Sequence, residues 1–123
     1  MMLKDEWRRF RISLAHAWRG IRTLFAHEPN ARIHLALAII AIALAWLLRF
    51  SASEWILLLL TIGLVITSEA MNTAIEALTD LISPEYHPQA KIAKDVAAGA
   101  VLLSALTAIA VALLLFLPKL LAF

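Results

Sequence analysis

Three acidic residues and one amide recur along a single stretch of the chain at helical spacing. Glu69, Asn72, Glu76 and Asp80 are separated by three, four and four residues, which places all four along one stripe of a helix. The segment before them, residues 55–68, contains no charged residue. An ionisable group at the centre of a membrane helix costs roughly 2.5–3.5 kcal/mol on the insertion scale, so such groups generally have a function. The pattern predicts a functional carboxylate at Glu69, where an apolar span becomes polar.

Phosphoryl transfer is the chemistry that suits carboxylates, lysines and amides at the boundary between a membrane and water. Carboxylates bind Mg²⁺ through one or two oxygens, and lysine neutralises phosphate charge. A carboxylate at the border of the hydrocarbon can accept a proton from a lipid hydroxyl. The chain has only three glycines, which excludes a P-loop and a kinase glycine-rich loop. An oligomeric proton or ion pathway and a structural membrane module remain open as alternatives.

The composition indicates a membrane protein with one domain, residues 1–123. Hydrophobic residues make up 63% of the chain, well above the usual range for soluble proteins, and the absence of cysteine excludes disulfides and thiolate chemistry. The apolar runs predict an all-α fold with three membrane-spanning helices, at residues 31–48, 54–82 and 89–117. We expect Ser53 to be the N-cap of the second span. We expect Pro118 to end the third.

An amphipathic helix, residues 4–27, is predicted to lie on the membrane surface before the first span. One of its faces is apolar and aromatic, and a second is basic, which is typical of an interfacial helix on anionic lipid. The apolar face consists of Trp7, Phe10, Leu14, Trp18, Ile21 and Phe25, and the basic face of Lys4, Arg8, Arg11, Arg19 and Arg22.

The distribution of positive charge predicts the orientation of the spans. Seven Lys and Arg residues lie in residues 1–34 and two more in residues 82–95, whereas the opposite turn and the C-terminal end carry one each. By the positive-inside rule, the N-terminus and the 83–94 loop face the cytoplasm. We therefore expect a multi-pass protein of the cell membrane, with its acidic residues gathered at the cytoplasmic interface.

Long ordered motifs resemble the prokaryotic diacylglycerol kinase and undecaprenol kinase family, the small integral-membrane lipid kinases. They are Glu69-x-x-Asn72-Thr-Ala-Ile-Glu76-x-x-x-Asp80, Tyr86-His87, Ala93-Lys94-Asp95 and Ala98-Gly-Ala-Val101, with Trp18-x-Gly20-x-Arg22, Glu28 and Asn30-x-Arg32 upstream. The segments Asn30-Ala-Arg-Ile-His34, Tyr86-His-Pro88 and Lys94-Asp-Val-Ala-Ala-Gly-Ala100 look more like the undecaprenol branch. The diacylglycerol branch commonly has an acid where this chain has His34, and Tyr and Ser where it has His16 and Ala98.

The resemblance implies an ATP- and Mg²⁺-dependent kinase that phosphorylates a membrane lipid hydroxyl, most simply that of undecaprenol, with diacylglycerol as the alternative. It also implies a homotrimer whose sites are shared between neighbouring subunits, and no nucleic acid partner. Glu69 would be the general base, Glu28 and Glu76 would hold Mg²⁺, and Asn72 and Asp80 would orient their neighbours. The implied nucleotide contacts are Arg9, His16, Glu28, Glu76, Glu85, Tyr86, His87, Lys94 and Asp95. The implied lipid contacts are Glu69, Asn30, Arg32, His34 and Ala98.

Overall fold

The computed structural model describes residues 1–122, and this part of the chain is built from helices alone. The four helices are α1 (Met2–His27), α2 (Pro29–Leu47), α3 (Ala52–Ile82) and α4 (Pro88–Leu121). By length and composition, α2, α3 and α4 can each cross a membrane. The prediction of an all-α membrane protein with three spanning helices is confirmed.

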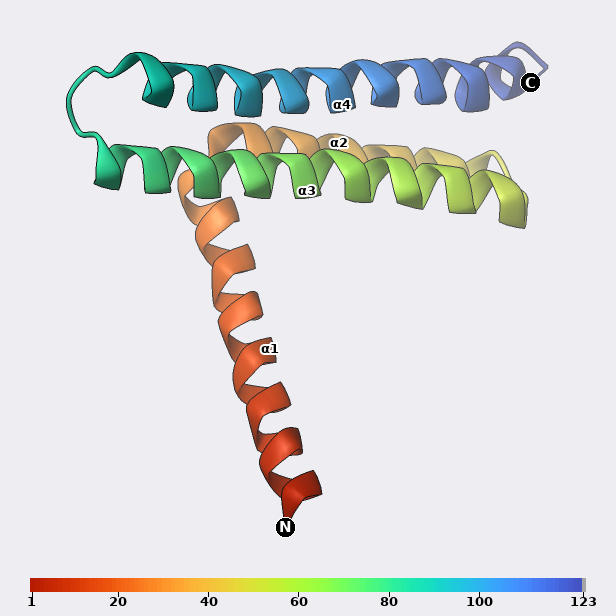
Figure 1. Cartoon of the computed structure of the whole chain (residues 1–123). Coiled ribbons are helices and arrows are strands. Elements are labelled where there is room, and N and C mark those ends of the chain that lie inside the picture. Colours follow the sequence, from red (N-terminus) through yellow and green to blue (C-terminus); the bar gives the residue numbers. More distant parts are fainter. Residues whose placement is uncertain (123) are drawn as a thin grey trace.

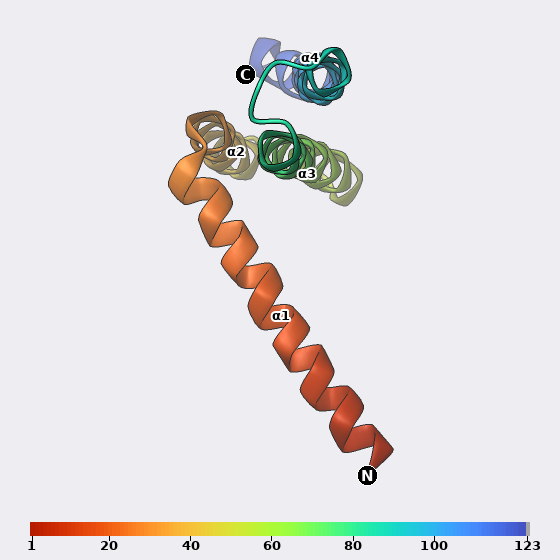
Figure 2. The same ribbon diagram turned by 60° about the vertical axis from the view of Figure 1, so that its left-hand side comes forward.

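Helices α2, α3 and α4 run alongside one another, and α1 leaves this bundle at the start of α2 (Figure 1). The turned view shows the same divergence of α1 (Figure 2). Helix α3 packs against both α2 and α4, more extensively against α4. At 1.5 Å per residue, α3 and α4 are about 46 and 51 Å long, whereas α2 is about 28 Å. The two longer helices therefore extend beyond the start of α2, on the side where α1 leaves.

The turn between α2 and α3 is fixed by backbone and side-chain caps. Arg49 has a φ of 56°, and the amides of Arg49 and Phe50 donate to the carbonyls of Trp46 and Ala45, at 3.2 and 3.1 Å. This is the Schellman arrangement, with arginine where glycine is usual. Ser51, not Ser53, is the N-cap of α3: its hydroxyl accepts from the Glu54 amide, and the Glu54 carboxylate accepts from the Ser51 amide. The Ser53 prediction is wrong because only position 51 lies three residues before the glutamate, as a capping box requires.

A hydrophobic cluster holds the three spans together beside this turn. Its buried members come from all three helices and the turn: Ala45, Phe50, Leu58, Leu115 and Phe116. Lys119 adds polar contacts at the edge, because its ammonium lies 3.0 Å from the Glu54 carboxylate and 5.3 Å from the centre of the Phe50 ring. Side-chain packing, which drives helix association in lipid, is therefore concentrated at this end of the bundle.

The helices are longer than the sequence predicts. Helix α1 begins at Met2. Helices α2 and α4 begin at Pro29 and Pro88, since proline is well suited to the first helical position. Helix α2 ends at Leu47, one residue before the expected end, and α3 begins at Ala52, directly after its cap. The expected end of the last span at residue 117 is wrong. Pro118 lies inside α4, which continues to Leu121.

The corner between α1 and α2 is closed by Arg32. Its guanidinium donates to the carbonyls of Phe25 and Ala26, at 3.4 and 3.2 Å, and these belong to the last turn of α1. Carbonyls at a helix C-terminus have no partner within the helix, so a cation that binds them stabilises the end. Arg32 therefore fixes the direction in which α1 leaves the bundle.

The hydrophobic cluster can be tested with Leu58→Ala, since Leu58 is only 4% exposed. We expect a loss of about 2–5 kcal/mol of stability, because neighbouring side chains refill such a cavity only in part. Thermal unfolding in detergent micelles measures it. The matched control is Leu114→Ala on α4, at a side chain that is 77% exposed, which should leave the melting temperature nearly unchanged. Equal effects of the two substitutions would contradict the assigned core.

Candidate functional site

Glu69 is the only charged side chain that the fold buries among residues 1–122. It is 2% exposed and lies on the same stripe of α3 as Leu58 and Val65, which are also buried. A carboxylate removed from water needs a charged or hydrogen-bonding partner, since its desolvation is otherwise uncompensated. The predicted catalytic residue therefore occupies the position at which α3 changes from an apolar to a polar helix.

The partner that the fold provides is His34, which lies on α2. Its Nε2 atom is 3.2 Å from Oε1 of Glu69, and the imidazole is 22% exposed. The same carboxylate oxygen has no hydrogen-bond partner, so the ring nitrogen is near it without the alignment of a hydrogen bond. Oε1 of Glu69 is thus close to an imidazole and still able to accept a hydrogen bond.

The next two members of the polar stripe are joined to each other. Nδ2 of Asn72 donates to Oε1 of Glu76 at 3.3 Å, and both side chains are half-buried. The other end of the amide, Oδ1 of Asn72, is buried without a hydrogen-bond partner. Asn72 therefore restrains the Glu76 carboxylate, and within residues 1–122 its Oδ1 is a second free acceptor one turn from Glu69.

Beyond Glu76, charged pairs tie the projecting parts of α3 and α4. Lys94 of α4 pairs with Asp80 of α3, and Asp95 pairs with Lys91 on its own helix. Lys94 and Asp95 therefore do not pair with each other, and Lys94 is not the partner of Glu69. These side chains are mostly exposed, and exposed pairs contribute about 0–1 kcal/mol each, so they remain available to a charged ligand.

The loop between α3 and α4 carries three of the predicted nucleotide contacts. Glu85 and Tyr86 are exposed, the tyrosine at 79%. His87 is the N-cap of α4, and its Nδ1 accepts a hydrogen bond from the amide of Gln89 at 3.1 Å. His87 therefore has a structural role in this chain, whereas no hydrogen bond or ion pair within residues 1–122 engages the side chains of Glu85 and Tyr86.

The remaining predicted residues are spread over α1, the corner and α4. Arg9 and His16 lie on the exposed part of α1, Asn30 and Ala98 are exposed, and Glu28 is half-buried at the corner. Within one copy of residues 1–122, Arg9 and His16 are not brought to Glu69, and no three His, Asp or Glu side chains converge as metal ligands.

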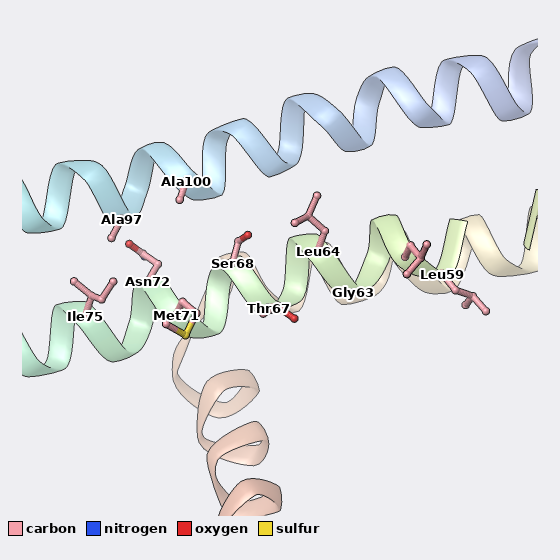
Figure 3. A pocket seen from close by; sticks show the side chains of 11 residues that line it. Leu59, Gly63, Leu64, Thr67, Ser68, Met71, Asn72, Ile75, Ala97 and Ala100 are labelled. Carbon is pink, nitrogen blue, oxygen red and sulfur yellow. The ribbon is translucent and has the colours of Figure 1, made fainter. Parts of the chain in front are cut away.

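A groove of about 500 Å³ runs along α3 and α4 past the polar stripe. Figure 3 shows Asn72 and Ser68 pointing from α3 toward α4, where Ala97 and Ala100 lie. The rest of the lining is mainly leucine, methionine and isoleucine from α3. The groove is therefore apolar along the spans and polar where it reaches Asn72.

The contact between His34 and Glu69 was missed from the sequence, although a signal for it exists. The tight turn between α2 and α3 makes them an antiparallel pair, and the register that brings Ala45 to Leu58 also brings His34 to Glu69. The buried residues of α2 recur every seven positions, at Ala31, Ala38 and Ala45, with His34 between the first two. This spacing, counted from the turn, identifies the residue of α2 that faces Glu69.

Comparison with known proteins gives consistent matches over most of the chain. Residues 15–116 match the profile of prokaryotic diacylglycerol kinase. The undecaprenol kinase of Bacillus subtilis is 43% identical over 95% of both chains. A diacylglycerol kinase of Synechocystis is 45% identical over 89% of this chain, which spans 63% of that relative. The diacylglycerol kinase of Escherichia coli is 33% identical over 76% of this chain and 77% of its own length.

The burial of Glu69 predicts that neutralising it leaves the fold intact. We expect Glu69→Gln to change the free energy of unfolding by no more than about 1 kcal/mol, since the amide is isosteric and removes a buried charge. Thermal unfolding in detergent, with circular dichroism as a measure of helix content, tests this. A loss of several kcal/mol would instead make Glu69 a structural ion-pair partner of His34.

Proposed function

The chain belongs to the prokaryotic diacylglycerol kinase family, and we propose that it transfers the γ-phosphate of ATP to the hydroxyl of undecaprenol. One match supports this choice of lipid: the relative that is named an undecaprenol kinase aligns over 95% of both chains and is 43% identical. The relatives named diacylglycerol kinases support the reaction type and provide the alternative lipid.

The observation that carries the proposal is a pair of buried acceptors without donors. Oε1 of Glu69 and Oδ1 of Asn72 lie one turn apart on α3, and neither has a hydrogen-bond partner. Buried polar atoms are nearly always satisfied, so two orphans on one stripe indicate a missing donor. A lipid hydroxyl, held at the membrane boundary by its chain, is a donor of the right kind.

Phosphoryl transfer at this place assigns the proton to Glu69. The lipid oxygen attacks the γ-phosphorus, its O–H proton passes to the Glu69 carboxylate, and the bond from the γ-phosphorus to the bridging oxygen breaks to release ADP. The groove beside Asn72 suits the hydrocarbon part of the lipid, since its lining is apolar along the spans. The low polarity around Glu69 excludes water, which protects the phosphoryl group from hydrolysis.

The donor set at the polar end fits Mg²⁺. Carboxylates are the ligands that this ion prefers, and it is commonly held by one or two of them together with substrate phosphates. Glu76 is oriented by Asn72, and Glu28 lies at the corner where α1 meets α2, so these two residues would hold the ion. The ion would neutralise phosphate charge, and Lys94 with Asp95, Glu85 and Tyr86 would contact the nucleotide.

We also propose that the site faces the cytoplasm and is completed by a second copy of the chain in a homotrimer. The excess of Lys and Arg at the α1 end supports the orientation. The position of Arg9 and His16 supports the assembly, because both are exposed on a helix that leaves its own bundle. A neighbouring subunit would have to supply them if they contact nucleotide.

The lipid can be identified by transfer of labelled γ-phosphate from ATP to undecaprenol and to diacylglycerol, offered in parallel in mixed micelles. We expect undecaprenol to be the better acceptor by kcat/KM. The negative control is Glu69→Gln, which should lower turnover about 10²–10⁴-fold, the usual contribution of a general base. A preference for diacylglycerol would replace the proposed lipid. Transfer to neither, together with pH-driven flux in liposomes without nucleotide, would favour an ion pathway.

The metal role of Glu76 predicts a change in Mg²⁺ dependence rather than a simple loss of activity. We expect Glu76→Gln to raise the Mg²⁺ concentration needed for half-maximal activity at least about tenfold, since the amide is a weaker ligand than the carboxylate. Activity measured against total Mg²⁺ at fixed ATP gives the curve. An unchanged curve would exclude a ligand role for Glu76.

A further inference from the structure

The fold gives the buried carboxylate of Glu69 one cationic or potentially cationic neighbour. Among residues 1–122, the only Lys, Arg or His nitrogen within 4 Å of this carboxylate is Nε2 of His34, at 3.2 Å. The other basic groups near this end of the bundle are engaged elsewhere: Lys94 pairs with Asp80, and Arg32 donates to the end of α1. His34 alone is therefore placed to compensate the charge of Glu69.

The placement of His34 is built into the packing of α2 on α3. Ala31 and Ala38 flank His34 at one-turn intervals on α2, and they are 0% and 7% exposed. Small residues at a helix interface let two backbones approach closely, and here they bring the imidazole within reach of α3. The ring is itself mostly buried, so its orientation is set by the interface and not by solvent.

Resting on the function proposed above, we propose that His34 is the positioning residue for the catalytic base. Its ring lies on α2 with Nε2 3.2 Å from Oε1 of Glu69, and so limits where the buried carboxylate can lie between α2 and α3. Because Oε1 makes no aligned hydrogen bond to the ring, it stays free to accept one from the lipid hydroxyl. Neighbouring side chains that fix the orientation of a reacting group are a recurrent feature of functional sites.

The proton balance needs no transfer through histidine. The hydroxyl proton of the lipid passes to Glu69 as the new O–P bond forms, and the carboxylic acid later loses it to water after the product leaves. His34 takes no part in this transfer. Loss of His34 therefore affects how much of the enzyme holds a correctly placed, ionised Glu69, and not how ATP binds.

The test compares His34→Ala and His34→Gln with the parent enzyme, in full-length protein and with undecaprenol as acceptor. We expect His34→Ala to lower kcat about 10–100-fold with KM for ATP within about twofold, as for other residues that orient a reacting group. His34→Gln, whose amide N–H can reach the same carboxylate, should recover much of this loss. The matched control is His27→Gln, at an exposed histidine of α1 whose ring contacts only the Thr23 carbonyl. Its kcat should stay within about twofold.

Coupling between the two residues gives a second, independent readout. In the Glu69→Gln background, His34→Ala should lower kcat little further, because the effects of substituting residues that act as a unit are not additive. In the ¹⁵N spectrum of histidine-labelled protein, the ring-nitrogen resonances of His34 should also shift when Glu69 is replaced by Gln. This spectrum needs neither lipid nor ATP, so it tests the pair when the His34 variants fold poorly or the wild-type chain does not phosphorylate the lipid.

Several results would overturn the assignment of His34. The first two are an unchanged kcat in His34→Ala and an equal loss of kcat on His34→Ala in the parent and Glu69→Gln backgrounds. The other two are a rise in KM for ATP with kcat unchanged, and a ¹⁵N signal of the His34 ring that is the same in the parent and Glu69→Gln proteins. An inactive wild-type enzyme with a coupled ring signal would overturn the proposed function and leave the pair standing. An active enzyme whose kcat and His34 ring signal do not respond to these substitutions would overturn the role of His34 and leave the proposed function standing.

Discussion

The structure depends on burying one carboxylate where the membrane bundle meets water. Removing Glu69 from solvent is unfavourable unless another group compensates for the lost hydration, and the basic side chain that the fold brings nearest to it is His34 on a neighbouring helix. That contact occurs in the same register of α2 against α3 that brings Ala45 to Leu58 in the hydrophobic cluster. The alanines of α2 follow from the same constraint, since only small residues allow the approach.

The two ends of the bundle are built differently: one end is tightly packed, and the other carries the polar residues of the candidate site. The end at the α2–α3 turn is capped, clustered and held by Lys119, so it sets the relative positions of all three spans. The opposite end, as far as residues 1–122 show, has exposed ion pairs and two unsatisfied acceptors. Rigid packing far from the polar stripe thus leaves that stripe free to bind ligands without loss of the fold.

Much of the fold and part of the site follow from the sequence. Spans were predictable because apolar runs and proline breaks are strong local signals, and the polar stripe of α3 followed from spacing alone. Cap positions and the continuation of α4 through Pro118 were missed, since they depend on side-chain geometry and local packing. The partners of Glu69 and Lys94 were not predicted, because contacts between helices need a register that local periodicity does not supply.

The arrangement of α1 bears on the proposal that the site is shared between two copies of the chain. Its basic and aromatic faces are exposed along residues 2–23, and it leaves the bundle at the level of the corner formed by Glu28. A helix with such faces is stabilised at a membrane surface, where its rings meet lipid and its cations meet phosphate. Lying there, it carries Arg9 and His16 away from its own Glu69. In the proposed assembly these residues would contact the nucleotide at the site of a neighbour, and the direction that Arg32 gives to α1 at the corner would determine which neighbour that is.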